Sequence, residues 1–255
     1  MACALGKRYL VDTPYVVRGK KGGGVMVPEW LDLAAVVVGA LAGVLAAQER
    51  KLDLVGFVAL CLICALGGGL LRDCIMQTGS VYALSSRWPI PLCVATALVG
   101  FMFPRVVTRF PNLYEWVDMV SVAFFVVAGT SKAMAYNLYA ASVVLMGTIT
   151  GVGGGMLRDV FLGEIPQVFR RSNLYALCAV TGSVAYYLCM KLFPTNEYVA
   201  IAVTLATVVL LRRVSLRLDI KSPAEIDLEP KVAHAGKRLS QELRTRKEWH
   251  RDSDG

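Results

Sequence analysis

The sequence predicts an all-α membrane protein with seven transmembrane helices, arranged as two inverted three-helix repeats plus one extra helix. Three observations lead to this fold class: an apolar composition, apolar residues gathered into uncharged blocks, and a motif that occurs twice. Of the 255 residues, 56% are hydrophobic and only 18% are charged, and the mean hydropathy is +0.54. This composition is too apolar for an ordinary soluble domain. Buried helices of a soluble protein would also need long polar faces, which the blocks lack.

Seven blocks without a charged residue correspond to the predicted helices. Most of them approach or exceed the roughly 17–25 residues that cross the hydrocarbon core of a membrane. Two are shorter, and each is extended if Asp32 or Asp118 lies inside its helix. The blocks are 33–48, 54–71, 88–104, 119–131, 133–157, 172–190 and 198–211.

A motif in the second block returns in the fifth block, 86 residues later. It is a glycine triplet followed by an Arg-Asp pair, "LGGGLLRD" at 66–73 and "VGGGMLRD" at 152–159. With the same spacing, "EWLD" at 29–32 matches "EWVD" at 115–118. The chain therefore contains an internal repeat. Because each copy holds three blocks, an odd number, the second copy enters the membrane from the opposite side, and the repeats are inverted.

The repeats divide the chain into five parts. They are a polar N-terminal extension (1–28), the first three-helix repeat (29–104), the second three-helix repeat (105–194), the seventh helix (195–211) and a basic C-terminal tail that we expect to be disordered (212–255).

The net charge of +8 lies mainly in the two ends of the chain. Basic segments beside membrane helices indicate orientation and contact with anionic lipid, rather than binding to nucleic acid. With the N-terminus outside, the inner loops hold more Lys and Arg than the outer loops, and the C-terminal tail is cytosolic, as the positive-inside rule requires. The bases within 1–28 favour the opposite orientation.

Each glycine triplet lies well inside its apolar block, where glycine weakens a helix by about 1 kcal/mol per residue relative to alanine. Backbone groups freed by a broken helix are tolerated there only if they line a cavity or are buried in protein. Broken helices at matching positions of inverted repeats indicate a permeation or binding site. Glycine also lets helices pack closely, but three consecutive residues point in different directions. We predict helix breaks at Gly67, Gly68, Gly69, Gly153, Gly154 and Gly155.

Charged residues follow each triplet, either within the membrane or at its interface. A charge inside the membrane costs a few kcal/mol or more unless it faces a polar cavity or a partner. The aspartate one turn into the first helix of each repeat is a natural partner for the arginine. The lysine in "GTSKA" has an alanine at its counterpart in the first repeat, and it either acts in gating or selectivity or is a charge at the end of a loop. The candidates are Arg72, Asp73, Arg158, Asp159, Lys132, Asp32 and Asp118.

Several segments, among them "GGGLLRD", "VAGTSKA" and "GTITGVGGGMLRDVFLGEIPQVF", resemble the trimeric intracellular cation channels and their prokaryotic relatives. The resemblance implies a homotrimer that conducts monovalent cations, chiefly potassium, through a pore in each protomer. The second and fifth helices, bent at the triplets, would line this pore, with Lys132, Arg72 and Arg158 near its constriction. It also implies contact with anionic lipid. One departure concerns "CIMQTGSVYAL", which follows Asp73 where relatives have a turn like "EIPQV" at 164–168.

Some relatives carry the label of a glycine-transporter domain, so the motifs leave two functions open. The first is a potassium-permeable channel, and the second is a carrier for a small zwitterion such as glycine. We do not expect an enzyme, a metal site or a cofactor, because the apolar part contains no histidine and no metal-binding cluster. We expect a multi-pass protein of the plasma membrane in a prokaryote or of an intracellular membrane in a eukaryote.

Overall fold

The computed structural model describes residues 29–77, 80–103, 113–170, 174–192 and 196–218. The predictions for the N-terminal extension, and for all but the start of the C-terminal tail, lie outside the described residues. Every regular element within these residues is an α-helix, as the sequence predicts. The helices belong to one compact unit, Met1–Lys221.

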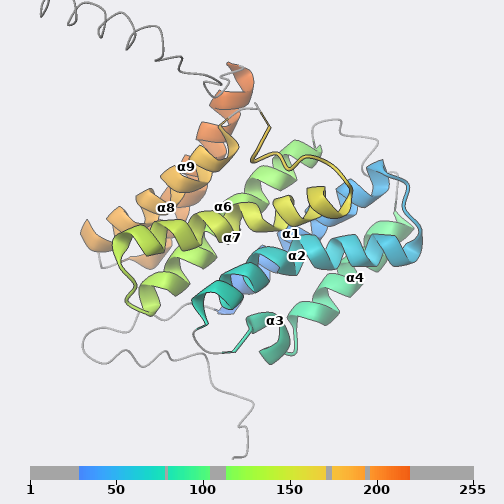
Figure 1. The fold of residues 1–255 in the computed structure, drawn as a ribbon, viewed down its shortest axis with the longest axis horizontal. Helices are drawn as coiled ribbons and strands as arrows, with labels where there is room; N and C mark the ends of the chain where they lie inside the picture. Colours follow the sequence, from blue (N-terminus) through green and yellow to red (C-terminus); the bar gives the residue numbers. More distant parts are fainter. Residues whose placement is uncertain (1–28, 78–79, 104–112, 171–173, 193–195, 219–255) are drawn as a thin grey trace, which may run out of the picture. The chain divides into compact units, whose positions relative to one another are not determined.

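Seven helices correspond to the seven predicted blocks, and one short helix precedes the third of them (Figure 1). They are α1 (Glu29–Glu49), α2 (Leu54–Met76), the short α3 (Tyr82–Ser85), α4 (Pro89–Met102), α6 (Leu113–Ala135), α7 (Ala140–Phe161), α8 (Tyr175–Leu192) and α9 (Glu197–Arg217).

Of the seven described helices that correspond to predicted blocks, six are long and apolar enough to cross a membrane. The exception is α4, with 14 residues. At 1.5 Å per residue α4 extends about 21 Å, which is less than a hydrocarbon core of about 30 Å. Its start is fixed by Pro89, which suits the first position of a helix because it lacks an N–H that would otherwise have no partner. The described part of the third helix is therefore shorter than the apolar block 88–104.

Two other boundaries differ from the predicted ones. The fifth block was expected to begin at 133, but residues 133–135 end α6, and the chain turns at Asn137 in a left-handed conformation, with φ of 54°. Asparagine tolerates this conformation better than most residues. At the other end of the chain, α9 continues to Arg217. Residues 212–217, predicted as part of the tail, are thus helical.

The contacts between helices reproduce the sequence repeat. In the first repeat α1, α2 and α4 pack against one another, and in the second repeat α6, α7 and α8 make the equivalent contacts. The two most extensive contacts between the repeats, α1 with α6 and α2 with α7, each pair a helix with its own counterpart. In Figure 1, α2 and α7 accordingly lie in the middle, between α3 and α4 on one side and α8 and α9 on the other.

The crossing of α2 and α7 shows that the repeats are inverted. A Cβ atom added to Gly154 would lie 2.8 Å from the carbonyl oxygen of Cys64, and one added to Gly68 would collide with the carbonyl oxygen of Thr150. Cys64 and Thr150 are themselves 86 residues apart. The earlier residue of each helix thus meets the later glycine of the other, so the helices are antiparallel. The contact of Gly154 with Cys64 and the contact of Gly68 with Thr150 are equivalent when one repeat is superposed on the other. The repeats are therefore related by a pseudo-two-fold axis that runs across the helices, in the membrane plane.

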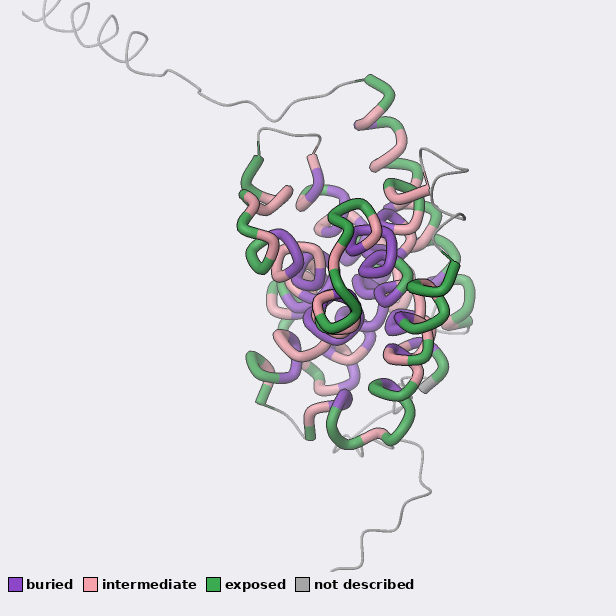
Figure 2. Tube along the Cα trace, turned by 90° about the vertical axis from the view of Figure 1, so that its right-hand side faces the viewer, coloured by how far each residue is buried: buried purple, intermediate pink, exposed green. Residues whose placement is uncertain are grey.

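The buried residues follow the central helices, and exposed residues gather at the helix ends and on the outer faces (Figure 2). One hydrophobic cluster fills the first repeat around Phe57, Leu60 and Ala97. Two others join the second repeat to α9 through Val208 and Ile201. The extra helix is therefore part of the core of the second repeat.

Candidate functional site: two buried Arg-Asp clusters at a helix crossing

The glycine triplets do not interrupt their helices. α2 is helical without a break from Leu54 to Met76, and α7 from Ala140 to Phe161. The predicted helix breaks are therefore wrong for this structure. Burial in the protein explains the difference, since a helix enclosed by neighbouring helices keeps its hydrogen bonds even where glycine lowers its intrinsic propensity.

Close packing accounts for the first two glycines of each triplet. Besides the contacts of Gly68 and Gly154 with backbone carbonyls, an added Cβ atom at Gly67 would lie 2.8 Å from Leu157 Cδ1. The inverted contact is the same, with Gly153 facing Leu71 Cδ1 at 2.9 Å. The helix backbones approach so closely here that no larger residue fits without displacement. The packing interpretation is correct for these four positions.

The third glycine of each triplet faces an arginine instead. The nearest atom to an added Cβ at Gly69 is Arg72 Nη2, at 4.0 Å. At Gly155 the nearest atoms are the Tyr175 hydroxyl at 3.0 Å and Arg158 Nη2 at 3.8 Å. Since a methyl group would fit at Gly69, this position leaves open space beside the guanidinium.

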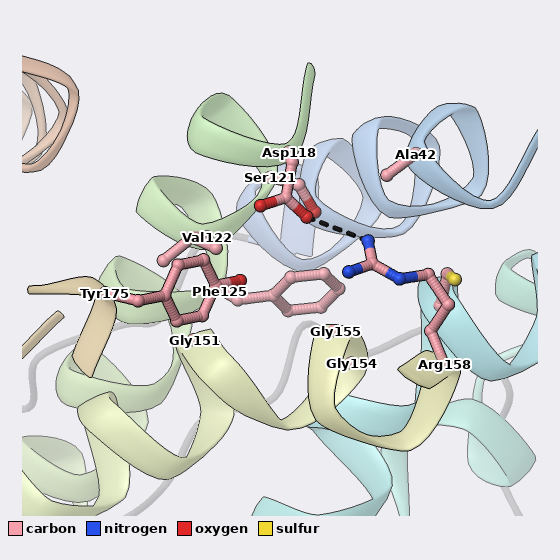
Figure 3. Close-up of a pocket in the computed structure, with 11 residues that line it drawn as sticks. Ala42, Asp118, Ser121, Val122, Phe125, Gly151, Gly154, Gly155, Arg158 and Tyr175 are labelled. Carbon is pink, nitrogen blue, oxygen red and sulfur yellow. Dashed lines mark hydrogen bonds and ion pairs between the residues drawn. The ribbon is translucent and has the colours of Figure 1, made fainter. Parts of the chain in front are cut away.

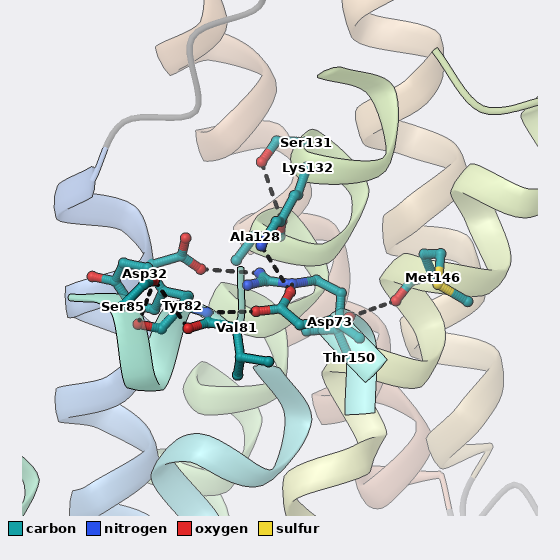
Figure 4. A network of polar contacts seen from close by, with 11 residues as sticks. Asp32, Asp73, Val81, Tyr82, Ser85, Ala128, Ser131, Lys132, Met146 and Thr150 are labelled. Atoms are coloured by element: carbon teal, nitrogen blue, oxygen red, sulfur yellow. Dashed lines mark hydrogen bonds and ion pairs between the residues drawn. The ribbon is translucent and has the colours of Figure 1, made fainter. Parts of the chain in front are cut away.

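In the first repeat, Arg72 is held between two aspartates, Asp32 and Asp73, which are labelled in Figure 4. Its Nη1 donates to Asp32 at 3.0 Å and its Nε donates to Asp73 at 2.8 Å. Asp73 also accepts from Lys132 Nζ at 2.8 Å, so α6 of the second repeat reaches into the cluster of the first. We call these four residues the first cluster.

In the second repeat, Arg158 repeats this arrangement without a lysine (Figure 3). Its Nη1 donates to Asp118 at 3.0 Å, and its Nε and Nη2 donate to Asp159 at 2.9 and 2.8 Å. The ring of Tyr114 lies 5.3 Å from the guanidinium carbon, within reach of a cation–π interaction. We call Arg158, Asp118 and Asp159 the second cluster.

Both clusters are buried, which excludes the interpretation that the arginines snorkel to the membrane surface. Only 1% of Arg72 and 2% of Arg158 is exposed. Asp32 and Asp118 are their partners, as predicted. A charge in such a place persists because its partners replace the water it has lost.

The aspartates that follow the arginines also fix the next loop. Asp73 Oδ2 accepts the backbone N–H of Tyr82, nine residues on, and Asp159 Oδ2 accepts that of Gln167, eight residues on, both at 2.9 Å. The loop after Asp73 differs in sequence from the family pattern and yet provides an equivalent donor. Despite the departure at "CIMQTGSVYAL", Asp73 makes the same contact with its loop as Asp159 does.

Known proteins share this repeated architecture. The family model described as "Glycine transporter" matches this chain twice, over residues 29–105 and 115–191. The chain belongs to this family. Two curated relatives are UPF0126 membrane proteins. The inner membrane protein YadS of Escherichia coli K12 is 32% identical over 203 residues, covering 78% of this chain and 96% of that protein. The protein from Deinococcus radiodurans is 34% identical over 197 residues, covering 76% and 90%.

Solved structures of this family have the same fold. The trimeric intracellular cation (TRIC) channel orthologue of Rhodobacter sphaeroides is 26% identical, with a TM-score of 0.68, covering 75% of this chain and 97% of that one. A second TRIC cation channel, solved to explain its conductance, is 28% identical with the same TM-score, covering 78% and 97%. The resemblance to TRIC channels is confirmed, and the chain is a multi-pass integral membrane protein.

Within the family fold, Lys132 makes the two clusters unequal. It lies in the last turn of α6 rather than in a loop, and only 14% of its side chain is exposed. Its counterpart in α1 is Ala46. The sequence shows this asymmetry, but its partner across the repeats, Asp73, is visible only in the structure.

Tyr175 is a site residue that the sequence analysis missed. It begins α8, it is 6% exposed, and its hydroxyl is buried without a hydrogen-bond partner among the described residues. Together with Ser121 and Arg158 it lines a small cavity beside the second cluster (Figure 3). No repeat signal marks Tyr175, because its counterpart at the start of α4 is Pro89.

Proposed function

We propose that this protein is a potassium-permeable monovalent cation channel, with a conduction path through each protomer beside the crossing of α2 and α7. The similarity to two solved TRIC cation channels carries the proposal, since the match extends over 97% of each of them. The two curated relatives are described as membrane proteins, and the match covers 96% and 90% of their length.

The two clusters provide groups suited to ion conduction. Buried carboxylates attract a cation, and the arginine beside them limits how tightly they hold it, because the guanidinium competes for the same oxygens. Conduction requires binding of this balanced kind, strong enough to admit an ion and weak enough to release it. The glycine contacts close the space between α2 and α7 at Gly68 and Gly154. We therefore assign the path to the other side of the triplets, where Gly69 and Gly155 face the arginines.

The assembly and orientation form part of this proposal. Three protomers associate, each with its own path, and the C-terminal tail is cytosolic. The trimer is supported by the description of the related channel from Rhodobacter sphaeroides as trimeric, and the orientation by the positive-inside rule. Anionic lipid binds the basic residues at the cytosolic ends of the helices.

Recording from purified protein in planar bilayers tests the function. A channel gives discrete unitary currents, and in a potassium chloride gradient their reversal potential lies near the potassium equilibrium potential. A carrier turns over too slowly to give resolvable steps. The same preparation in liposomes is tested for uptake of labelled glycine, because the family model is described as a glycine transporter. Glycine uptake without unitary currents would replace the channel by the carrier.

A further inference from the structure

The two clusters differ by one unit of charge. The first cluster contains two cations, Arg72 and Lys132, and two carboxylates, Asp32 and Asp73. These charges cancel. The second cluster has two carboxylates and a single cation, because alanine stands at the position equivalent to Lys132. It therefore keeps one excess negative charge, and an uncompensated charge in the membrane interior is unfavourable.

A cavity adjoins the cluster that carries this excess charge. Its size, about 10 Å³, leaves room for about one water-sized sphere. Polar groups lie on its wall along with small residues and the ring of Phe125 (Figure 3). The polar side chains that line it are Asp118, Ser121, Arg158 and Tyr175.

The Tyr175 hydroxyl marks this cavity as a place for a ligand. Leaving a buried hydroxyl without a partner costs about 1–3 kcal/mol, so such groups generally bind water or a ligand. The Tyr175 hydroxyl has no partner among the described residues. The three guanidinium nitrogens of Arg158 already donate to aspartates.

The first repeat lacks these groups at the matching positions. The counterpart of Ser121 is Ala35, and the counterpart of Tyr175 is Pro89. At these two matching positions, hydroxyl groups stand in the second repeat and apolar residues in the first.

We propose that this cavity binds one monovalent cation, which compensates the charge of the second cluster as the Lys132 ammonium compensates that of the first. The inference deepens the proposed function and rests on it for the identity of the ion, potassium. A dehydrated potassium ion is close to a water molecule in size, so it fits the cavity. A divalent cation is disfavoured, because the site offers a single excess negative charge and a second positive charge would have no partner.

Arg212 also carries a positive charge near this cluster. Its guanidinium carbon lies 4.7 Å from the ring centre of Tyr175, and its Nη2 lies 3.4 Å from the side-chain oxygen of Gln167. It is half-buried and does not line the cavity. Arg212 thus lies against the tyrosine ring, outside the wall of the cavity.

Thermal unfolding of the purified protein tests the site without relying on conduction. Potassium chloride is varied while N-methyl-D-glucamine chloride keeps the ionic strength constant. Binding to the folded state alone raises the melting temperature by about 2–4 °C at a potassium concentration about ten times the dissociation constant. Tyr175→Phe removes most of this shift. Tyr187→Phe, a control on the same helix whose ring lies against Lys191, keeps it.

A second variant separates the excess charge from the hydroxyl groups. Lys132→Ala leaves the first cluster with one excess negative charge, but Ala35 and Pro89 stand there in place of Ser121 and Tyr175, so the potassium-dependent shift stays close to that of the wild type. A wild-type protein that melts at the same temperature in both salts contains only water in the cavity, and an undiminished shift in Tyr175→Phe places the ion elsewhere. Either result overturns the site. Unitary currents without a potassium-dependent shift refute the site and keep the channel, whereas a shift without currents keeps the site and refutes the channel.

Discussion

In the first repeat Arg72 shares its aspartates with Lys132, whereas in the second repeat Arg158 has its two aspartates to itself. The backbones around these side chains are related by a pseudo-two-fold axis, so each helix contact in one repeat has an equivalent in the other. The two repeats therefore share a fold but differ in the charge of their buried clusters. Lys132 produces this difference in charge, because its counterpart in the first repeat is Ala46.

We expect the largest difference between the two repeats when the arginine of each cluster is replaced. Arg158→Leu leaves two buried carboxylates without their cation, and we expect it to lower the free energy of unfolding by about 3–5 kcal/mol. Arg72→Leu costs less, because Lys132 remains bound to Asp73. Chemical denaturation in detergent, followed by circular dichroism, measures both losses. Equal losses would show that Lys132 adds no compensation to the first cluster.

The glycine triplets provide the next largest effect. Gly68→Ala and Gly154→Ala place a methyl group against a backbone carbonyl of the opposite helix, and we expect each to lower the free energy of unfolding by about 1–3 kcal/mol. Gly69→Ala is the matched control, because its methyl group meets open space and adds up to about 1 kcal/mol of helix propensity. Melting temperatures and potassium flux are measured together. If Gly68→Ala raised the melting temperature, the close crossing described above would be refuted.

The smallest effect belongs to a charged contact near one end of α7. Glu164 bonds Arg170 at 2.9 Å and also pairs with Arg50, and all three side chains are partly exposed. We expect Glu164→Gln to change the free energy of unfolding by less than about 1 kcal/mol, and by still less at high salt. Unfolding at two salt concentrations measures this. A loss comparable to that of Arg158→Leu would show that this partly exposed contact stabilises the fold as much as a buried cluster does.

The sequence alone predicts the larger part of this fold. Hydropathy locates the helices because each crosses an apolar medium, and the spacing of Gly67 and Gly153 reveals the inverted repeat. The pairing of Arg72 with Asp32 was also predictable, because a charge in an apolar medium needs a partner and the apolar blocks offer few candidates. The end of α6 at Ala135 was not predictable, because apolar residues continue into the turn.

The role of the triplets could not be predicted, because it depends on how closely two helices approach. The low helix propensity of glycine predicts a helix break at Gly68. The contact with the carbonyl oxygen of Thr150 shows instead that Gly68 allows the two helices to pack closely. Tyr175 was missed for a related reason. Its hydroxyl matters only because α8 places it over Gly155, and nothing in its sequence neighbourhood indicates that contact.

The seventh helix has no counterpart, yet it touches equivalent residues of both repeats. Near the start of α9 the ring of Tyr198 stacks on Trp30 at 6.3 Å, and near its end the guanidinium of Arg213 lies 5.0 Å from the ring of Trp116. These tryptophans occupy the same position in the two repeats. From Tyr198 to Arg213 the helix advances by 15 residue steps, or about 22 Å. α9 thus connects equivalent tryptophans of the two repeats, so a displacement of this one helix would act on both repeats at once through its two ends.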